Sequence, residues 1–168
     1  HNHFNESSAL NPSCFYGKAK KLCEELILAQ SSILDVHTLI LRLPPVLNQS
    51  ESSNVGRLIN LSKKGMPIPS IAQGDTNQRS FISFNNIETV FTHILKHPDL
   101  IKKNKIYNLA DDNFISLNEL LRVGGNSNIY SLPMFLGKFL FYIPFLKVIL
   151  MKLFGNFVLD NTKLKEEM

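Results

Sequence analysis

The sequence has 168 residues, enough for one domain or for a large part of a bigger one. Hydrophobic residues make up 44% and charged residues 19%, an ordinary globular composition that excludes disordered, collagen-like and disulfide-scaffold proteins. The net charge is +4, but the basic residues are scattered in ones and twos, as at Lys20–Lys21 and Lys63–Lys64. A nucleic-acid partner would favour a basic stripe, so we expect none.

The two cysteines, Cys14 and Cys23, have neither the CxxC spacing nor the neighbouring histidines of a zinc site. We therefore expect free thiols in a reducing, cytoplasmic compartment and no metal site. The amino terminus has no charged region followed by an apolar one, so it is not a signal peptide. It lacks an initiator Met and opens in loop-like sequence, so we expect a fragment or a cleavage product.

The first elements in chain order follow the pattern of an α/β protein. Apolar residues at helical spacing predict an amphipathic helix over Tyr16–Gln30. His37–Val46 is an apolar, β-branched run that ends at two prolines, which predicts a buried strand of a parallel sheet. A helix followed by a buried strand is typical of α/β folds.

The same patterns predict five further elements: helices over Val55–Lys64, Asn86–His97 and Leu117–Arg122, and strands over Ser80–Phe84 and Ile106–Leu109. Ser116 and Glu119 form a capping box that opens the third of these helices. His93 and His97 share a helical face at metal-ligand spacing, but no acidic residue or third histidine accompanies them. We interpret both histidines as structural.

The stretch Leu132–Leu159 is the most apolar part of the chain. Lysines interrupt it at Lys138, Lys147 and Lys152, so no apolar helix of about 20 residues can be drawn, and a transmembrane span is not expected. Two interpretations remain: helices that cover a core or pack on a partner, and an interfacial helix on anionic lipid with lysine anchors. We favour the first over peripheral membrane contact.

Tyr16 and Lys20 stand four residues apart in the first predicted helix, so both side chains project from the same face. A phenol has an unperturbed pKa of about 10, and a nearby ammonium favours its ionised form, which suits acid/base chemistry. The spacing alone is weakly specific, because a Tyr and a Lys four apart on a lysine-rich helix are often only a solvated face.

The chain also carries five motifs, in order and over nearly its whole length: Asn11–Lys20 (NPSCFYGKAK), Leu41–Val46 (LRLPPV), Gly65–Pro69 (GMPIP), Gln78–Ile87 (QRSFISFNNI) and Ile106–Leu109 (IYNL). Together they resemble the second half of the extended short-chain dehydrogenase/reductase family, in particular its nucleotide-sugar epimerases, dehydratases and 4-keto reductases. That family has the pattern P-x-x-x-Y-G-x-S-K, then a helix, then a strand with R-P-x-x-V-Y-G. Several motifs in the right order are far more specific than any one of them.

The resemblance implies that Tyr16 is the catalytic Tyr, which exchanges a proton with a sugar hydroxyl or keto oxygen. It implies that Lys20 binds the nicotinamide ribose and favours ionisation of the Tyr, so both residues also belong to the cofactor site. Pro44, Pro45 and Val46 match the strand-end loop beside the nicotinamide. Without the family, the two prolines are equally well an ordinary strand terminator. The implied cofactor is NAD or NADP, bound mainly by a half that this chain lacks.

The resemblance also implies a substrate site. Arg79 matches an arginine that meets the diphosphate of the nucleotide sugar, and a guanidinium suits bidentate contact with phosphate. Asn54 falls near a helix N-terminus that contacts the same diphosphate, where free backbone amides favour an anion. The alternatives are a surface Arg and an ordinary N-cap Asn. Family members pair through the helix that carries the Tyr, which implies a homodimer through Tyr16–Gln30.

Several departures from the family bear on activity. The family opens with a Gly-rich turn for the pyrophosphate of NAD, and this chain has only Gly124–Gly125, late and without the required strand and helix. The family's catalytic Ser or Thr lies further upstream of the Tyr than the 15 residues present here, so Ser13 does not take that role. Ala19 replaces the usual Ser, and Asn86 stands where an Asp is usual.

We therefore predict an α/β fold, namely the carboxyl-terminal part of a Rossmann-type parallel sheet plus a small α/β substrate-binding region. Residues 1–48 would be the last part of the Rossmann domain, with the helix that carries Tyr16 and Lys20. Residues 49–168 would be mainly the substrate-binding region, with some elements returning to the sheet.

The predicted function is that of an NAD(P)-dependent enzyme acting at C4 of a UDP-sugar, as a 4-epimerase or a 4-keto reductase, in surface polysaccharide synthesis. The chain alone is expected to be inactive and not to bind NAD tightly, because the pyrophosphate site is absent. The rival interpretation is a non-catalytic, truncated family member that serves as a binding or assembly module. The sequence leaves open the sugar, the nucleotide and the choice between NAD and NADP.

Overall fold

The strands of this protein come together as parallel pairs. The computed structural model describes residues 3–47, 54–65, 68–71, 77–101, 104–123, 125, 129–132 and 155–168. In this part of the chain four two-stranded pairings form, and all four are parallel. The pairs are β1 (His3–Phe4) with β8 (Val158–Leu159), β2 (Leu39–Arg42) with β6 (Lys105–Asn108), β3 (Val46–Leu47) with β5 (Ile82–Ser83), and β4 (Ile68–Ile71) with β7 (Ile129–Leu132). Because parallel strands need long crossover connections, each pair joins segments far apart in the sequence.

The predicted first helix is confirmed and extends beyond both predicted ends. Helix α1 covers Phe15–Leu34. Cys14 is its N-cap, and the Cys14 sulfur accepts a hydrogen bond from the Gly17 N–H at 3.4 Å. The helix ends at Asp35, whose φ of 51° is left-handed and whose N–H bonds to the Ser31 carbonyl. This is the helix-ending geometry usually taken by glycine or asparagine.

The predicted strand over His37–Val46 is wrong in its extent, because it splits in two. Strand β2 covers Leu39–Arg42 and pairs in parallel with β6, Lys105–Asn108. A separate strand β3, Val46–Leu47, pairs in parallel with β5, Ile82–Ser83. The two intervening prolines have no N–H to give to a strand ladder, so the pairing breaks between β2 and β3.

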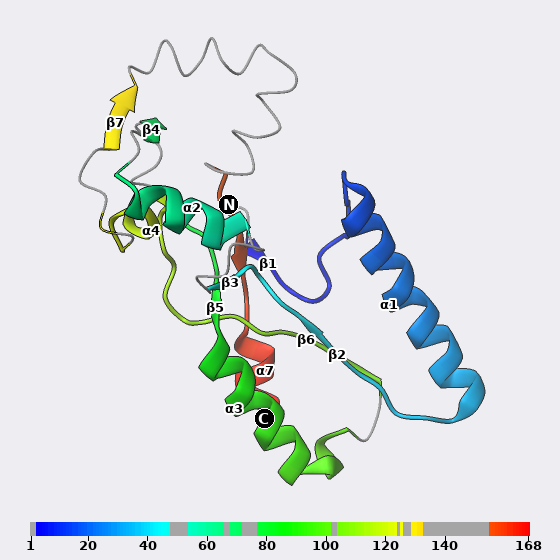
Figure 1. The fold of residues 1–168 in the computed structure, drawn as a ribbon. Helices are drawn as coiled ribbons and strands as arrows, with labels where there is room; N and C mark the ends of the chain where they lie inside the picture. The colour runs from blue at the N-terminus through cyan, green and yellow to red at the C-terminus, as the bar shows by residue number, and fades with distance from the viewer. Residues whose placement is uncertain are drawn as a thin grey trace.

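Helices cover both faces of the β2–β6 pair (Figure 1). Helix α1 lies on one face, and helices α3 (Phe84–Lys96) and α7 (Thr162–Glu167) lie on the other. The core on the α3 side is built from buried residues of β5, β6, the position after β6 and α7: Ile82, Tyr107, Leu109 and Leu164. Half-buried residues of β2, β3 and α3 pack against them: Leu39, Leu41, Val46, Ile87 and Val90. Burial of these side chains stabilises the layered arrangement.

A second, smaller core joins α2, Asn54–Lys63, to α4, Leu117–Val123. Ile59, Phe81 and Leu120 are its buried members. The predicted capping box at the start of α4 is confirmed: the Glu119 N–H donates to the Ser116 hydroxyl at 3.1 Å, and the Ser116 N–H donates to the Glu119 carboxylate at 2.7 Å. Strands β4, Ile68–Ile71, and β7, Ile129–Leu132, form the remaining pair.

Two boundaries differ from the sequence-based expectations. Phe84 begins α3 instead of ending a strand, because the Ser83 hydroxyl accepts the Asn86 N–H at 3.3 Å and so caps the helix. After α3 a short 3-10 helix, η2, covers Pro98–Leu100. Most of the apolar stretch Leu132–Leu159 lies outside the described residues. In the described part of the chain, no helix is long and apolar enough to cross a membrane.

Both ends of the described chain take part in the fold, which the sequence patterns did not predict. Strand β1, His3–Phe4, pairs in parallel with β8, Val158–Leu159. The Asn108 amide, 1% exposed, donates to the carbonyl oxygens of Phe4 and Asp160, both at 3.1 Å. A buried amide paired in this way ties both terminal segments to the end of β6.

Helix α7 is held against β6 by polar contacts as well as by its core leucine. The Tyr107 hydroxyl donates to the Glu167 carboxylate at 2.7 Å, and the Lys163 ammonium lies 5.1 Å from the centre of the Tyr107 ring. Burial, together with the neighbouring Glu167 carboxylate, raises the pKa of Tyr107 to about 12. The phenol therefore stays protonated as a hydrogen-bond donor over the physiological pH range.

Candidate active site

Tyr16 and Lys20 lie on one exposed face of α1, as the spacing predicts. Tyr16 is 73% exposed. The Lys20 ammonium lies 5.6 Å from the centre of the Tyr16 ring, within the range of a cation–π contact. The structure thus brings the two predicted catalytic side chains together, with the phenol open to a ligand.

The direction of α1 places this pair at the carboxyl end of β2. Along α1, Glu24 bonds to Arg42 at the end of β2, whereas Ser31 bonds to Asn104 beside the start of β6. The helix therefore runs antiparallel to the strand. Tyr16 lies two turns before Glu24, about 12 Å further along at 1.5 Å per residue, and so beyond the carboxyl end of β2. Open α/β sheets bind their ligands at this edge.

The first turn of α1 is fixed by a close approach of the preceding loop. A Cβ atom at Gly17 would lie 2.8 Å from the Pro12 Cβ, which is too close for any side chain. The glycine next to Tyr16 therefore lets the loop pack directly on the helix. This contact holds the Tyr16 end of α1 in place.

A partly buried ion pair fixes α1 further along. The Arg42 guanidinium donates from Nε to a Glu24 oxygen at 3.1 Å and from Nη2 to the other oxygen. Its Nη1 donates to the Glu6 carbonyl oxygen at 2.9 Å. The Arg42 and Glu24 side chains are 18% and 14% exposed. Such a bidentate pair sets both the distance and the rotation of α1 relative to β2.

The predicted strand-end loop lies at the same edge. Pro44 is buried and Pro45 is exposed. The Pro45 carbonyl accepts the Ile82 N–H at 3.2 Å, and Val46 is paired with Ile82 in β3 and β5. The loop is thus anchored to β5 at the carboxyl end of β2, the end beyond which Tyr16 lies.

Arg79 lies just before β5, with its guanidinium partly buried. Its Nη1 donates to the Gly155 carbonyl oxygen at 2.9 Å. Desolvation by burial lowers the pKa of Arg79, although a guanidinium remains charged at any physiological pH. Within the described residues no acidic side chain forms an ion pair with it. A desolvated cation of this kind favours an anionic ligand.

Asn54 is the first residue of α2, so a helix begins where the sequence predicts one. Its side chain lies outside the described part. Val55, in the first turn of α2, packs against the cluster that contains Phe81, and Ile115 packs there too. Arg79 pairs with Ile115 through an antiparallel bridge. The start of α2 and the Arg79 strand therefore adjoin one small core.

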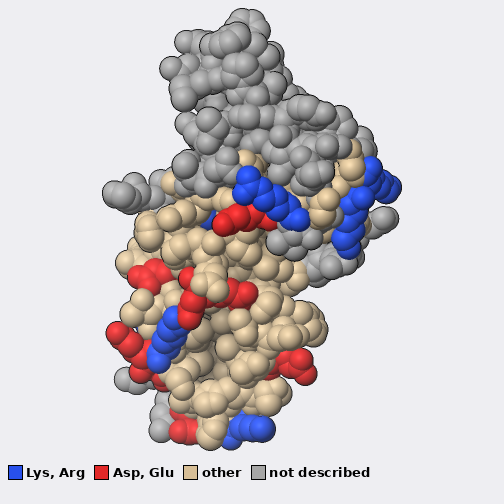
Figure 2. Space-filling model, turned by 90° about the vertical axis from the view of Figure 1, so that its left-hand side faces the viewer, with Lys and Arg blue, Asp and Glu red and all other residues tan. Residues whose placement is uncertain are grey.

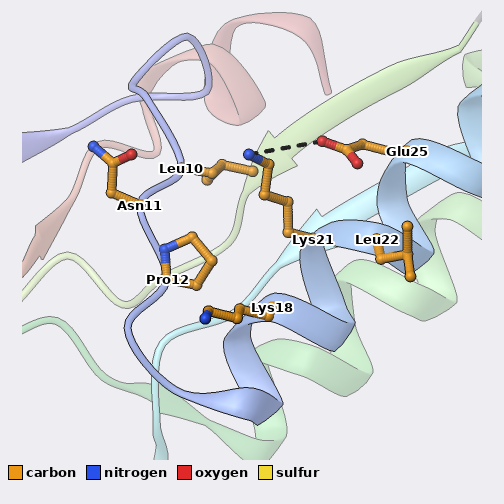
Figure 3. A pocket seen from close by; sticks show the side chains of 7 residues that line it. All are labelled: Leu10, Asn11, Pro12, Lys18, Lys21, Leu22 and Glu25. Atoms are coloured by element: carbon orange, nitrogen blue, oxygen red, sulfur yellow. Dashed lines mark ion pairs between the residues drawn. The ribbon is translucent and has the colours of Figure 1, made fainter.

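Among the described residues, two surface hollows are lined by side chains other than Tyr16. One, of about 460 Å³, lies between the loop before α1 and the helix itself. Figure 3 shows Lys18, Lys21 and Leu22 on the helix side and Leu10 and Pro12 on the loop side. The other, of about 420 Å³, has a polar lining that includes Gln78, Asp112 and Glu119. Neither contains Tyr16, Lys20 or Arg79 in its lining.

The surface charges are mixed. On the face shown in Figure 2, lysine and arginine side chains are interspersed with acidic ones over the described residues. The ring of His93 on α3 and that of His97, the residue that caps α3, have centres 4.7 Å apart and planes tilted by 45°. In the described part of the chain, no three potential metal ligands gather.

Among known proteins, only solved structures are similar to this chain. No protein-family model matches the sequence, and no curated protein matches it. Solved structures do: the UDP-N-acetylglucosamine 4-epimerase of Bacillus cereus has a TM-score of 0.68 at 17% identity, over 97% of this chain and 51% of that one. The UDP-Glc/GlcNAc 4-epimerase of Campylobacter jejuni has 0.65 at 19%, over 99% and 53%. The UDP-glucuronic acid 4-epimerase of Bacillus cereus, in complex with NAD, has 0.62 at 19%, over 77% and 45%.

The chain shares the fold of these three 4-epimerases over about half of their length. The predicted fold class is confirmed by these structures and by the parallel pairing of the strands. The chain spans about half the length of the first two epimerases. The division of the chain at residue 48, and the roles of Tyr16, Lys20, Pro44, Pro45, Val46, Asn54 and Arg79, remain predictions.

Sequence reasoning within this fold missed the partner of Arg79. Gly155 is 76 positions from Arg79 in the sequence. A lone glycine carries no pattern that predicts a carbonyl contact to a distant guanidinium. The only signal was the apolar run Phe157–Leu159 close to Gly155, and that run is too short to indicate a strand.

Proposed function

We propose that this chain is the substrate-side half of an NAD(P)-dependent enzyme that acts at C4 of a UDP-sugar, as a 4-epimerase or 4-keto reductase of surface polysaccharide synthesis. The observation that carries the proposal is the position of Tyr16 and Lys20, exposed together beyond the carboxyl end of β2. The similar solved structures support the substrate class, because several are named as 4-epimerases of UDP-sugars.

The residues present fit the nicotinamide end of such a cofactor. Lys20 offers an exposed ammonium for ribose hydroxyls, and the Pro44–Val46 loop adjoins the same edge. The donors for the pyrophosphate would come from outside this sequence, which has no Gly-rich turn of the required kind. Bound NAD(P) would supply the hydride acceptor or donor for C4.

The chain's own residues would manage the proton and the substrate. In the oxidative direction, Tyr16 in its ionised form, with its negative charge stabilised by the Lys20 ammonium, takes the proton of the O4 hydroxyl. In the reductive direction, Tyr16 returns the proton to the keto oxygen. Arg79 and the N-terminus of α2 at Asn54 hold the diphosphate, which fixes the sugar near Tyr16.

Arg79 provides the test of this proposal. A charge-assisted contact to phosphate contributes about 1.5 to 3 kcal/mol, so Arg79→Ala is expected to raise the UDP-sugar dissociation constant about 10- to 100-fold. Isothermal titration calorimetry with the UDP-sugar measures the change, and NAD affinity in a protein with both halves should hardly move. Arg122→Ala, at an exposed position on α4, is the matched control and should bind normally. Unchanged UDP-sugar affinity, or equal loss of both ligands, would contradict the diphosphate role.

We also propose that the complete protein is a homodimer through α1. Leu22, Leu26 and Ile33, on the face of α1 away from β2, are 56%, 53% and 73% exposed. Burial of such an apolar face on a second copy is favourable by about 25 cal/mol per Å². Cys23 and Ile27 beside it would be shielded as well.

The dimer proposal predicts the effect of one added charge. Leu26→Glu is expected to convert a protein with both halves from dimer to monomer at tens of micromolar, as measured by light scattering, because a carboxylate would have to be buried. Leu95→Glu on α3 places the same charge at a residue that is 79% exposed and outside the proposed interface, so it should leave the dimer intact. A monomeric parent protein would overturn the proposal.

The second candidate is a non-catalytic binding or assembly module. The exposed apolar residues of α1 favour it. A module of this kind would keep its partner when Tyr16 loses its hydroxyl, whereas an enzyme would lose turnover. The Tyr16 substitution therefore distinguishes the two candidates.

A further inference from the structure

The extended segment around Arg79, just before β5, is held by the segment Gly155–Leu159. The Ser80 N–H donates to the Phe157 carbonyl at 2.8 Å, and the Phe157 N–H donates to the Gln78 carbonyl at 2.9 Å. The Leu159 N–H donates to the Ser80 hydroxyl at 2.9 Å. These bonds join the two segments as a parallel ribbon around Arg79.

The residue before Phe157 contributes a side chain to the same ribbon. The Asn156 Oδ1 accepts the N–H of Gln78 at 2.9 Å. This bond satisfies the backbone donor immediately before Arg79. The opposite edge of the strand is fixed too, because the Ile115 N–H donates to the Arg79 carbonyl at 3.1 Å. The backbone of Arg79 is thus clamped from both sides.

The same segment sets the direction of the guanidinium. The Gly155 carbonyl accepts a hydrogen bond of 2.9 Å from one of the five N–H groups of the Arg79 guanidinium. A planar guanidinium with one fixed donor keeps the others in a defined fork, which suits bidentate contact with phosphate oxygens. One short segment therefore fixes both the main chain and the side chain of Arg79.

The segment is itself anchored to the amino-terminal part of the fold. The centre of the Phe157 ring lies 5.5 Å from that of the Phe4 ring. Phe157 is followed directly by β8, which pairs with β1. In the loop after β1, the Glu6 carbonyl accepts a hydrogen bond from the Arg42 guanidinium on β2. The segment that holds Arg79 is thereby linked to the strand at whose end Tyr16 lies.

We propose that Gly155–Phe157 is a positioning element for the candidate diphosphate site, and that Asn156 is a positioning residue that acts on the ligand through Arg79. The inference rests on the proposed function, since it assumes that Arg79 meets the diphosphate. Asn156 itself need not touch the ligand. Its contribution is to hold the Arg79 strand at the register in which the guanidinium meets the Gly155 carbonyl.

A double-mutant cycle on the 168-residue chain tests the inference, with UDP as the probe in calorimetry. Asn156→Ala is expected to raise the UDP dissociation constant by about threefold or more when Arg79 is present, and to have no further effect in the Arg79→Ala background. A residue that acts only on overall stability would weaken both backgrounds equally, so the thermal unfolding midpoint is measured alongside. The control is Asn161→Ala, in the same terminal segment as Asn156. It removes the hydrogen bonds that the Asn161 amide donates to the Ala110 carbonyl and the Asp112 carboxylate. It should lower the midpoint without changing UDP affinity.

The outcomes separate the two proposals. Arg79→Ala without effect on UDP overturns the diphosphate role itself. A strong Arg79→Ala effect with none for Asn156→Ala, or an equal Asn156→Ala effect in both backgrounds, overturns the positioning role alone. Should Asn156→Ala fail to fold, Asn156→Ser keeps a polar side chain, but its hydroxyl is one bond closer to the backbone and does not reach the Gln78 N–H as Oδ1 does. Weaker UDP binding is again expected only when Arg79 is present.

Discussion

Replacing Tyr16 by Phe is expected to lower the turnover number of a protein that unites this chain with its nucleotide-binding half by a factor of about 100 or more. The substitution removes the hydroxyl that exchanges a proton with the sugar and keeps the ring, which lies beside the Lys20 ammonium. Steady-state kinetics should therefore show a lower kcat with little change in UDP-sugar affinity.

Two lysines on α1 extend this experiment, one as a second test and one as its matched control. Lys20→Met removes the ammonium beside the Tyr16 ring and is expected to lower kcat as well. Lys18→Met removes an ammonium that lines the hollow formed with Leu10 and Pro12, so kcat should be unchanged. A loss of less than about threefold for Tyr16→Phe would exclude Tyr16 as the acid/base.

The Glu24–Arg42 pair predicts a large effect on stability. Glu24→Ala is expected to lower the free energy of unfolding by about 2 kcal/mol, between the scale for an exposed ion pair and that for removing one partner of a fully buried one. The reason is that the guanidinium, 18% exposed, keeps its charge and loses both carboxylate bonds. Urea denaturation followed by circular dichroism measures the change.

The neighbouring pair on the same helix is the control. Glu25 lies 3.8 Å from Lys21, with side chains 59% and 41% exposed. Exposed pairs of this kind contribute about 0 to 1 kcal/mol, so Glu25→Ala should leave the urea midpoint nearly unchanged. Equal effects of the two alanine substitutions would show that burial does not set the strength of the Glu24 pair.

The helices could be predicted because their signals are local. The apolar spacing of α1 and the Ser116–Glu119 capping box of α4 each lie within a few residues, and both elements form where the patterns place them. The Ser83 cap was missed because the alternation over Ser80–Phe84 indicated a strand. A single hydroxyl bond to the Asn86 N–H decided the boundary instead.

The short strands could not be predicted, because only distant partners define them. Strand β1 is two residues long and has no periodicity of its own; it exists because His3 and Phe4 pair with Val158 and Leu159. The same distinction between local and distant signals applies to the residues of the candidate site. Tyr16 and Lys20 share one helix and could be placed from their spacing, whereas the contact of Arg79 with Gly155 depends on two segments meeting in space.

The all-parallel pairing of the described strands has a consequence for how the chain reaches its fold. No described pair is a hairpin, so no strand can find its partner locally, and each pairing must close a long loop of chain before it gains any hydrogen bond. Such non-local topologies carry an entropic barrier that slows folding. Helix α1 can form from contacts within its own 20 residues, whereas the edge beside which Tyr16 comes to lie exists only after β2 has met β6. We therefore expect the helix to form early and the environment of its tyrosine to form late.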